Sequence, residues 1–318
     1  MFSLKFEIPD SPLKISTESK ICLIGSCFSD EIGKKLHTYK FNCLSNPFGT
    51  VYNPVSILKS IRNEIEPSNL TEQDGIFYHR DCHGKISGLN SKEAEKKVTD
   101  AVRSLNGFIR NANVLILTFG TAFIYRLKST NEIVGNCHKI PAASFSKELL
   151  SKEEIIDAFL KTHKHIKDIH PDLNIILTVS PVRHTRDGLI ESNLSKAVLL
   201  QAVHDLTEQF SDVHYFPSYE IIIDELRDYR FYAKDMIHPS EEAIDYVWDR
   251  FCETYFDTDT QKFIPEWQSI LQALNHKPFH PSSRAHQQFL KNTLEKLENY
   301  NRSVDVSKEI SELRNQIQ

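Results

Sequence analysis

Hydrophobic and polar positions follow two patterns that alternate along the chain. Short continuous apolar runs, typical of strands buried in a parallel sheet, each end at a Gly, Ser or Pro. These runs are 21–24, 41–44, 114–119, 175–179 and 213–216. Apolar residues at helical spacing predict helices over 29–39, 55–65, 91–105, 151–169, 192–210, 219–226 and 240–251. The alternation predicts an α/β fold in which helices cover both faces of one parallel sheet.

Three further stretches do not fit this alternation. The segments 77–89 and 123–134 have weak alternation and turn residues, which predicts hairpin insertions. From Pro278 onward, leucines and isoleucines lie at helical spacing among many charges, which predicts two amphipathic helices. We therefore expect a main domain over 1–277 and a helical extension over 278–318 that packs on the main domain or joins copies into a homo-oligomer.

Composition narrows the class of protein. A net charge of −5 gives no electrostatic reason to expect nucleic acid as a partner. No apolar run approaches the length of a membrane span, and residues 1–20 lack the apolar core of a signal peptide. The six cysteines are scattered and contain no CxxC pair, so neither disulfides nor a zinc site is indicated. We expect a cytoplasmic protein that uses no membrane and no cofactor.

One metal candidate remains in the first hairpin. His79, Asp81 and His83 alternate, so they are able to share one face of a strand and to supply two imidazoles and a carboxylate. An exposed polar strand has the same pattern and is more common. We therefore predict no metal site.

Polar residues gather where the predicted strands end. The groups are Ser26 and Cys27, 46–50, Thr121, 136–139, Arg183 with His184, and 235–238. In open α/β sheets, ligands bind outside the carboxyl ends of the strands. The sequence therefore predicts a site at this edge of the sheet.

The first of these groups is able to supply a nucleophile. The run 21–24 ends at Gly25, Ser26 and Cys27 follow, and a helix start comes next. Such a turn holds a thiol or hydroxyl over a helix N-terminus, where its anion is stabilised and the pKa of a thiol is expected to fall. A purely structural turn with incidental Ser and Cys explains the same residues equally well.

The last group is able to supply a base. Asp235 lies three residues before His238, in the loop after the last predicted strand. The imidazole is placed to act as general base, and the carboxylate to hold its tautomer. An Asp and a His at this spacing occur often by chance, and a simple loop is the alternative.

Several motifs in this order resemble the GSCFA-domain family. They are 25–29 (GSCFS), 46–54 (NPFGTVYNP), 119–122 (FGTA), 136–139 (NCHK), 180–184 (SPVRH) and 235–240 (DMIHPS). The likeness runs from about Ile21 to Phe251, and Ser29 stands where the signature has Ala. The family is similar to the SGNH or GDSL hydrolases, which implies a three-layer α/β/α flavodoxin-like fold. It also implies an enzyme that acts on esters, often acetyl esters of sugars.

The resemblance also assigns roles to residues. Aligned on Gly25, the position of the catalytic serine falls on Cys27 and not on Ser26, and the catalytic pair falls on Asp235 and His238. The glycine that donates to the oxyanion falls on Gly49. The oxyanion asparagine is replaced by Ala122, and the loss of one such donor costs about 10² to 10³ in rate. Thr121 and Asn136 are the candidate substitutes.

The remaining polar motifs are candidates for substrate binding. His138 with Lys139, and Arg183 with His184, are able to hold a substrate or an anionic carrier, although a hairpin end and a salt-bridged loop explain them too. We expect a hydrolase that removes O-acyl groups, in the first place acetyl, from a small-molecule or glycan ester. We expect the Cys27 side chain to face His238, and Ser26 not to. The alternatives are an acyltransferase that uses acetyl-CoA and a non-catalytic binding module on the same scaffold.

Overall fold

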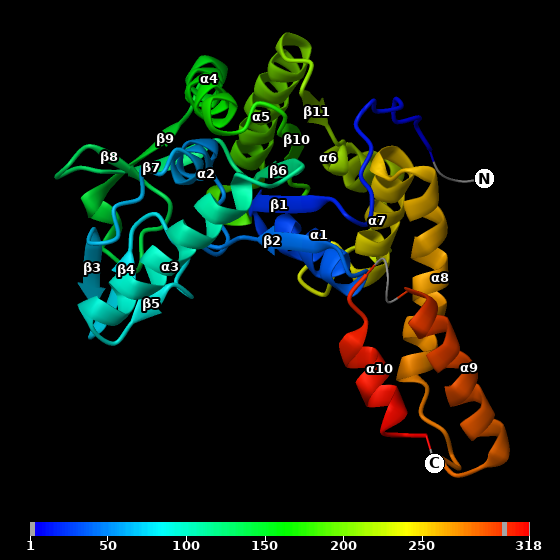
Figure 1. Ribbon diagram of the computed structural model, residues 1–318. Helices are drawn as coiled ribbons and strands as arrows, with labels where there is room; N and C mark the ends of the chain where they lie inside the picture. Colours follow the sequence, from blue (N-terminus) through cyan, green and yellow to red (C-terminus); the bar gives the residue numbers. More distant parts are fainter. Residues whose placement is uncertain (1–3, 301–303, 318) are drawn as a thin grey trace.

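A computed structural model describes residues 4–300 and 304–317, with a five-stranded parallel sheet at the centre (Figure 1). Its strands are β1 (Lys20–Gly25), β2 (Asn42–Ser45), β6 (Val114–Phe119), β10 (Asn174–Val179) and β11 (Val213–Tyr215). They lie side by side in the order β11-β10-β6-β1-β2. If only the parallel strands are numbered, this is the order 2-1-3-4-5 of flavodoxin-like folds. The order in which the chain adds strands to the sheet reverses between β1 and β6. The predicted parallel α/β sheet is confirmed.

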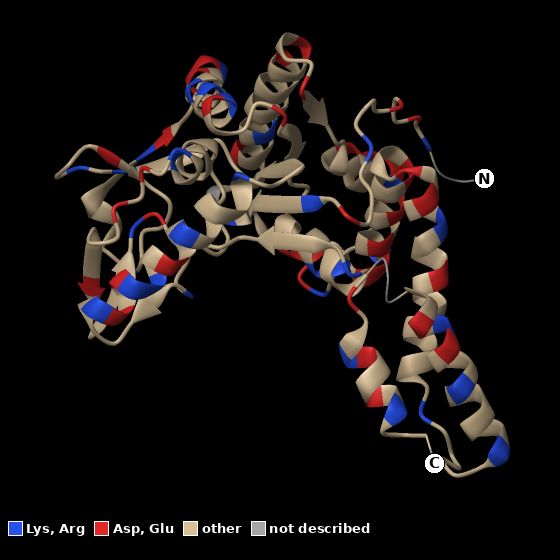
Figure 2. Ribbon diagram, in the orientation of Figure 1, with Lys and Arg blue, Asp and Glu red and all other residues tan. Residues whose placement is uncertain are grey.

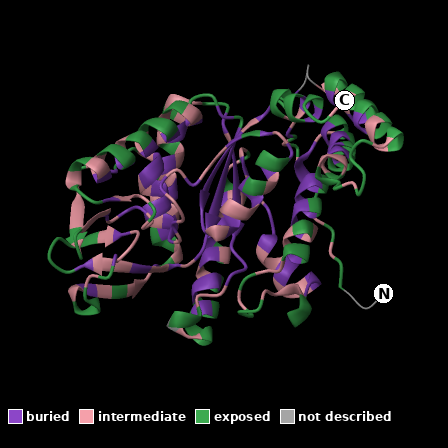
Figure 3. Cartoon of the chain, turned by 90° about the horizontal axis from the view of Figure 1, so that it is seen from below, coloured by how far each residue is buried: buried purple, intermediate pink, exposed green. Residues whose placement is uncertain are grey.

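Side chains of the strands alternate between two hydrophobic cores. Ile21 and Leu23 of β1 pack in the core formed with α1 (Cys27–Thr38) and α7 (Glu241–Tyr255). Cys22 and Ile24 pack in the opposite core. The helices of that core are α2 (Pro54–Ile61), α3 (Ser91–Ile109), α4 (Lys152–Ile169) and α5 (Leu189–Gln209). Figure 3 shows the strands buried between helices whose outer faces are exposed, so the predicted three-layer arrangement is confirmed.

Each predicted hairpin is part of a small antiparallel sheet with a third strand. The first sheet contains β3 (Leu70–Gln73), β4 (Ile76–His79) and β5 (Ser87–Gly88). The second contains β7 (Phe123–Leu127), β8 (Glu132–Val134) and β9 (Phe145–Leu149). The pattern missed β3 and β9 because both are short, largely polar and only partly buried.

Some helix boundaries differ from the prediction. Helix α1 begins at Cys27, since the Ser26 side chain caps it, and α5 begins at Leu189 behind Gly188. The segment predicted as one helix after β11 is α6 (Ser218–Glu220) followed by a π-helical turn, η3 (Ile221–Glu225). Single 3₁₀ turns are η1 (Ala142–Ser144), η2 (Thr185–Asp187) and η4 (Tyr229–Phe231).

The C-terminal helices form an arm that extends away from the sheet (Figure 1). The two predicted amphipathic helices are present as α9 (Arg284–Tyr300) and α10 (Ser307–Arg314), but the pattern missed α8 (Thr258–Asn275), which contains Pro265. Trp267 of α8 is fully buried and its indole N–H donates to the Thr38 carbonyl oxygen at 2.8 Å. The arm therefore shares the core of α1 and α7.

Charged residues of both signs are interspersed along the helices (Figure 2). Within the described ranges, no helix combines the length and the apolar character that crossing a membrane requires.

Candidate functional site

The turn after β1 depends on a glycine. Gly25 has φ +147°, and a Cβ at this position would lie 2.2 Å from the Thr118 carbonyl oxygen of β6. The next residue, Ser26, donates its N–H to that same oxygen at 3.1 Å. The Ser26 side chain is buried, and its hydroxyl accepts the Phe28 N–H as the cap of α1. Close approach of β1 to β6 thus fixes the start of α1 at the point where the strand order reverses.

Cys27 is the first residue of α1 and is partly exposed. Burial raises the pKa of its thiol, and the nearby charges of Asp30 and Glu31 raise it further. The Cys27 backbone N–H and the charge of Lys196 act in the opposite direction. The expectation of a depressed thiol pKa is therefore wrong, because the helix N-terminus is outweighed by burial and by two carboxylates. Near neutral pH the thiol needs a base in order to react.

Side-chain hydrogen bonds of Asn46 hold the loop between β2 and α2 against this turn. Its side-chain oxygen accepts the Gly25 N–H at 2.8 Å, and its amide nitrogen donates to Asp30 at 2.7 Å. Gly49 has φ +72°, and its N–H donates to the Asn46 carbonyl oxygen at 2.7 Å. A Cβ on Gly49 would lie 2.4 Å from His83. The N–H that the resemblance assigns to the oxyanion thus closes a turn inside this loop.

After the end of β6, a side chain of α5 hydrogen-bonds with the polar groups of the 120–122 motif. The Ala122 N–H donates to the Ser195 hydroxyl at 2.7 Å, and the Ala122 side chain is buried. The Thr121 hydroxyl lies 3.0 Å from the Ser195 hydroxyl and accepts the Phe123 N–H. Thr121 is therefore held in place by α5.

Lys196 on α5 was missed by the sequence analysis. Its Nζ donates to the carbonyl oxygens of Gly120 and Ser180, both at 2.6 Å, and the residue is 1% exposed. Burial, followed by the charge of Arg183, lowers its pKa to about 7, while Cys27 acts in the opposite direction. The available signal was the position of Lys196 at helical spacing with Leu199, Val203 and Leu206, all buried.

Asp235 and His238 form a pair within one loop. His238 Nδ1 donates to Asp235 at 2.7 Å, and the other Asp235 oxygen accepts the N–H groups of Ile237 and His238. These bonds, the His238 N–H first, lower the pKa of Asp235 to about 2. With Nδ1 donating, Nε2 is the acceptor nitrogen of a neutral imidazole. Both side chains are about half exposed, at 49% and 52%.

A cavity of about 560 Å³ lies between this loop, the segment after β10 and the start of α5. Its wall contains Asp235 and also Arg183, which follows the carboxyl end of β10. Arg183 contacts Asn193, and its guanidinium lies 5.9 Å from the Tyr219 ring. Among hydrogen bonds between described residues, none joins the side chain of Ser26 or Cys27 to His238.

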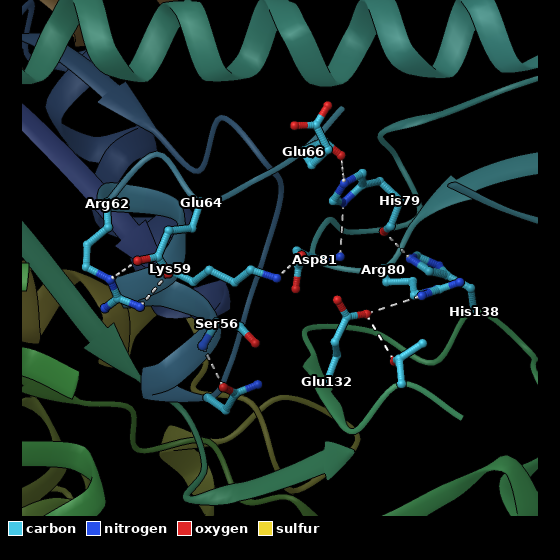
Figure 4. A network of polar contacts seen from close by, with 12 residues as sticks. Ser56, Lys59, Arg62, Glu64, Glu66, His79, Arg80, Asp81, Glu132 and His138 are labelled. Carbon is cyan, nitrogen blue, oxygen red and sulfur yellow. Dashed lines mark hydrogen bonds and ion pairs between the residues drawn. The ribbon is translucent and has the colours of Figure 1, made fainter. Parts of the chain in front are cut away.

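His138 lies in a network of polar contacts that includes residues of both small sheets (Figure 4), and Asn136 is bonded to it. His138 Nε2 donates to the His79 carbonyl oxygen at 2.7 Å, and its ring stacks on Tyr78. The Asn136 N–H donates to the Arg80 carbonyl oxygen, and its side-chain oxygen accepts the His138 N–H. These contacts occupy both residues at the joint of the two insertions, and a role in substrate binding remains a prediction.

His79 ends β4, and Asp81 and His83 lie in the loop that follows, so the three residues do not share one face of a strand. His79 Nε2 donates to the Glu66 carbonyl oxygen, and Nδ1 accepts the Asp81 N–H (Figure 4). Asp81 is buried and pairs with Lys59 at 2.7 Å, while His83 Nδ1 accepts the Lys85 N–H. Over residues 4–300 and 304–317, no cluster of three or more His, Cys, Asp or Glu side chains is suited to hold a metal.

The strand order and the turn after β1 define a three-layer α/β/α protein of the flavodoxin-like class, with polar groups at its switch point. Within this class, the chain belongs to the GSCFA family, whose model matches residues 20–251. A second model, described as the C-terminal domain of GSCFA domain proteins, matches residues 267–318 and begins inside α8. The resemblance drawn from the motifs is confirmed.

Among the solved structures that overlap the chain at low similarity are carbohydrate esterases. A family 3 carbohydrate esterase from Clostridium thermocellum shares 12% identity at a TM-score of 0.37, over 80% of this chain and 98% of that one. A family 3 esterase from Talaromyces cellulolyticus shares 10% at 0.36, over 79% and 99%. An acetyl xylan esterase from Butyrivibrio proteoclasticus shares 10% at 0.39, over 82% and 66%. These scores are low, so the fold assignment rests on the strand order. The comparison with curated proteins gives no match.

Proposed function

We propose that the protein is a hydrolase of O-acyl esters on a carbohydrate-type substrate, with Cys27 as nucleophile and His238 as base. The observation that carries this proposal is the cavity bounded by Arg183 and Asp235. Asp235, which binds His238, and Arg183, which follows β10, both line it, whereas Ser26 and Cys27 are not among its lining residues. The substrate class, with acetyl as the simplest acyl group, follows from the resemblance of the motifs to SGNH hydrolases.

In the proposed reaction, His238 Nε2 takes the Cys27 proton through one bridging water, and the thiolate attacks the ester carbonyl carbon. The tetrahedral intermediate collapses to a thioester, and the sugar oxygen leaves with the proton from His238. Water then hydrolyses the thioester to the free acid and restores the thiol. Asp235 holds Nδ1–H throughout and stabilises the imidazolium.

Stabilisation of the oxyanion is assigned to the N-terminus of α1. The Phe28 N–H is bonded to the Ser26 hydroxyl and the Ser29 N–H to the Ser26 carbonyl oxygen, so the Cys27 N–H is the donor of this helix start assigned to the oxyanion. The bond that Gly49 makes to Asn46 and the methyl side chain of Ala122 leave fewer donors than the resemblance implies. A slower hydrolase is therefore expected.

A second candidate is a non-catalytic binding module. It is favoured by the lack of a direct Cys27–His238 hydrogen bond among described residues, together with Ala122 at the asparagine position. An acyltransferase would form the same thioester but pass the acyl group to an acceptor alcohol other than water.

The test is hydrolysis of p-nitrophenyl acetate and of an acetylated xylo-oligosaccharide by the purified protein. Variants Cys27→Ala and His238→Ala should lose turnover, whereas Ser26→Ala should keep it if the variant folds. Equal activity in wild type and His238→Ala rules out the proposed base. Acid release without turnover of acetyl-CoA supports the hydrolase, transfer from acetyl-CoA to an added sugar supports the transferase, and saturable sugar binding without turnover supports the binding module.

A further inference from the structure

The cavity beside the Asp235–His238 pair has a largely apolar wall. Its volume, about 560 Å³, lies within the usual range of small-molecule pockets. Apolar and aromatic side chains come to it from four segments: the start of α5, the π-helical turn η3, the turn η4 and the loop before α7. They are Leu189, Ile223, Tyr229, Tyr232, Met236 and Ile237.

Three of these apolar side chains are open to solvent. Leu189 is 59% exposed, Tyr229 75% and Met236 55%. Exposed apolar side chains that gather around one concavity mark a binding surface, whereas single ones need no explanation. Met236 also has φ +60°, an unfavourable conformation for a long side chain, and the tight loop fixes it there.

Three of the four charged groups in the same wall form ion pairs, and the fourth, Arg183, is hydrogen-bonded to Asn193. Asp235 binds His238, and Arg227 binds Asp224 at 2.7 Å. Asp228 accepts the Arg230 N–H, and Arg183 contacts Asn193. The part of the wall without a partner in the structure is therefore mainly its exposed apolar surface.

We propose that this cavity binds an aliphatic acyl chain longer than acetyl, with the ester carbonyl toward the Asp235–His238 loop. The inference rests on the proposed function and specifies its acyl group, because Asp235, which binds the proposed base His238, lies in the cavity wall. An acetyl group has two carbons and would leave most of the apolar wall against water. Each further buried methylene favours binding by about fourfold.

The experiment compares p-nitrophenyl acetate, butyrate and octanoate as substrates of the full chain. We expect kcat/KM to rise at least tenfold from acetate to octanoate. Met236→Asn makes the wall polar and suits the left-handed backbone at that position. Leu189→Ser makes the wall polar at the start of α5. Both variants should lose the preference for octanoate, chiefly through KM. Ile190→Ser is the matched control, since Ile190 is 81% exposed and does not line the cavity.

The outcomes separate this inference from the proposed function. Wild-type preference for acetate, or a preference for octanoate that survives in both variants, overturns the inference while leaving the hydrolase intact. If no ester is cleaved, the proposed function fails, and binding of octanamide against acetamide is measured by calorimetry instead. Octanamide binding that Met236→Asn weakens and Ile190→Ser does not still supports the pocket, and equal binding of both amides overturns it.

Discussion

Lys196 donates from Nζ to the Gly120 carbonyl oxygen at 2.6 Å, so a buried amine on α5 caps the end of β6. Lys196→Met should lower the free energy of unfolding by about 2–4 kcal/mol, because it leaves the buried Gly120 and Ser180 carbonyl oxygens without a donor. Urea unfolding monitored by circular dichroism measures the loss. A neutral result would mean that water replaces the amine.

The same lysine makes stability depend on pH. Its folded-state pKa of about 7 lies below its ordinary value of 10.5, so between these values the unfolded chain binds more protons. Wild-type stability should therefore rise, relative to Lys196→Met, as pH increases from about 7 to about 10. Urea unfolding at pH 6.5 and 9.5 tests this, with the methionine variant cancelling the contribution of other groups. A constant difference would contradict the pKa shift.

Cys27 should be alkylated before the four buried cysteines, Cys22, Cys43, Cys82 and Cys252. Because burial raises its thiol pKa, the rate should be low at pH 7 and should still be rising above pH 9. Mass spectrometry of partially labelled protein ranks all six sites. Cys137, which is also partly buried, is the internal comparison, and labelling of Cys22 ahead of Cys27 would show that the turn is closed to solvent.

Asp235→Asn should lower kcat by about 10²-fold or more, because an amide does not hold the His238 tautomer. Folding should be unaffected, since the pair is half exposed. Glu241→Gln, an exposed acid at the start of α7 that does not line the cavity, is the control. The pKa of Asp235 is about 2, so a fall of kcat as pH is lowered from 7 to 4 would come from the titration of another group. Unchanged kcat in Asp235→Asn would remove the pair from the mechanism.

Gly25→Ala should cost about 3 kcal/mol of stability or prevent folding, since its Cβ would lie 2.2 Å from a backbone oxygen that has no room to move. Gly107→Ala is the matched control. Gly107 lies in α3 with no atom within 4 Å of a new Cβ, so alanine should stabilise the helix by about 0.5–1 kcal/mol. Thermal unfolding of both variants decides whether strain or flexibility matters at Gly25.

The joint between the two small sheets should loosen in mild acid. Burial lowers the pKa values of His79 and His138, so below about pH 6.5 the unfolded chain binds protons that the folded chain does not. Stability is lost as pH falls from there toward the folded-state values. Hydrogen exchange at pH 7 and pH 5, corrected for intrinsic rates, should show loss of protection in β4 and β8 before β6. Uniform loss across the protein would contradict a local effect.

The central sheet could be predicted because its strands are buried on both faces and therefore appear as continuous apolar runs. Gly25, Cys27 and the Asp235–His238 pair were found for a similar reason, since local motifs carry them. Strand β3 is polar on a half-exposed sheet and gives no such signal. The bonds of Lys196 and the raised pKa of Cys27 come from residues far apart in the sequence, which a pattern along the chain does not bring together.

The contact between Trp267 and Thr38 limits where the chain can be truncated and where related genes can recombine. The indole of the C-terminal arm lies against the end of the helix that begins at Cys27, and Lys40 pairs with Glu309 at 2.5 Å beyond it. The two stretches matched by separate family models therefore share one interior. A truncated version that stops before α8 would expose that interior to water, and recombination between related genes would have to carry both stretches together.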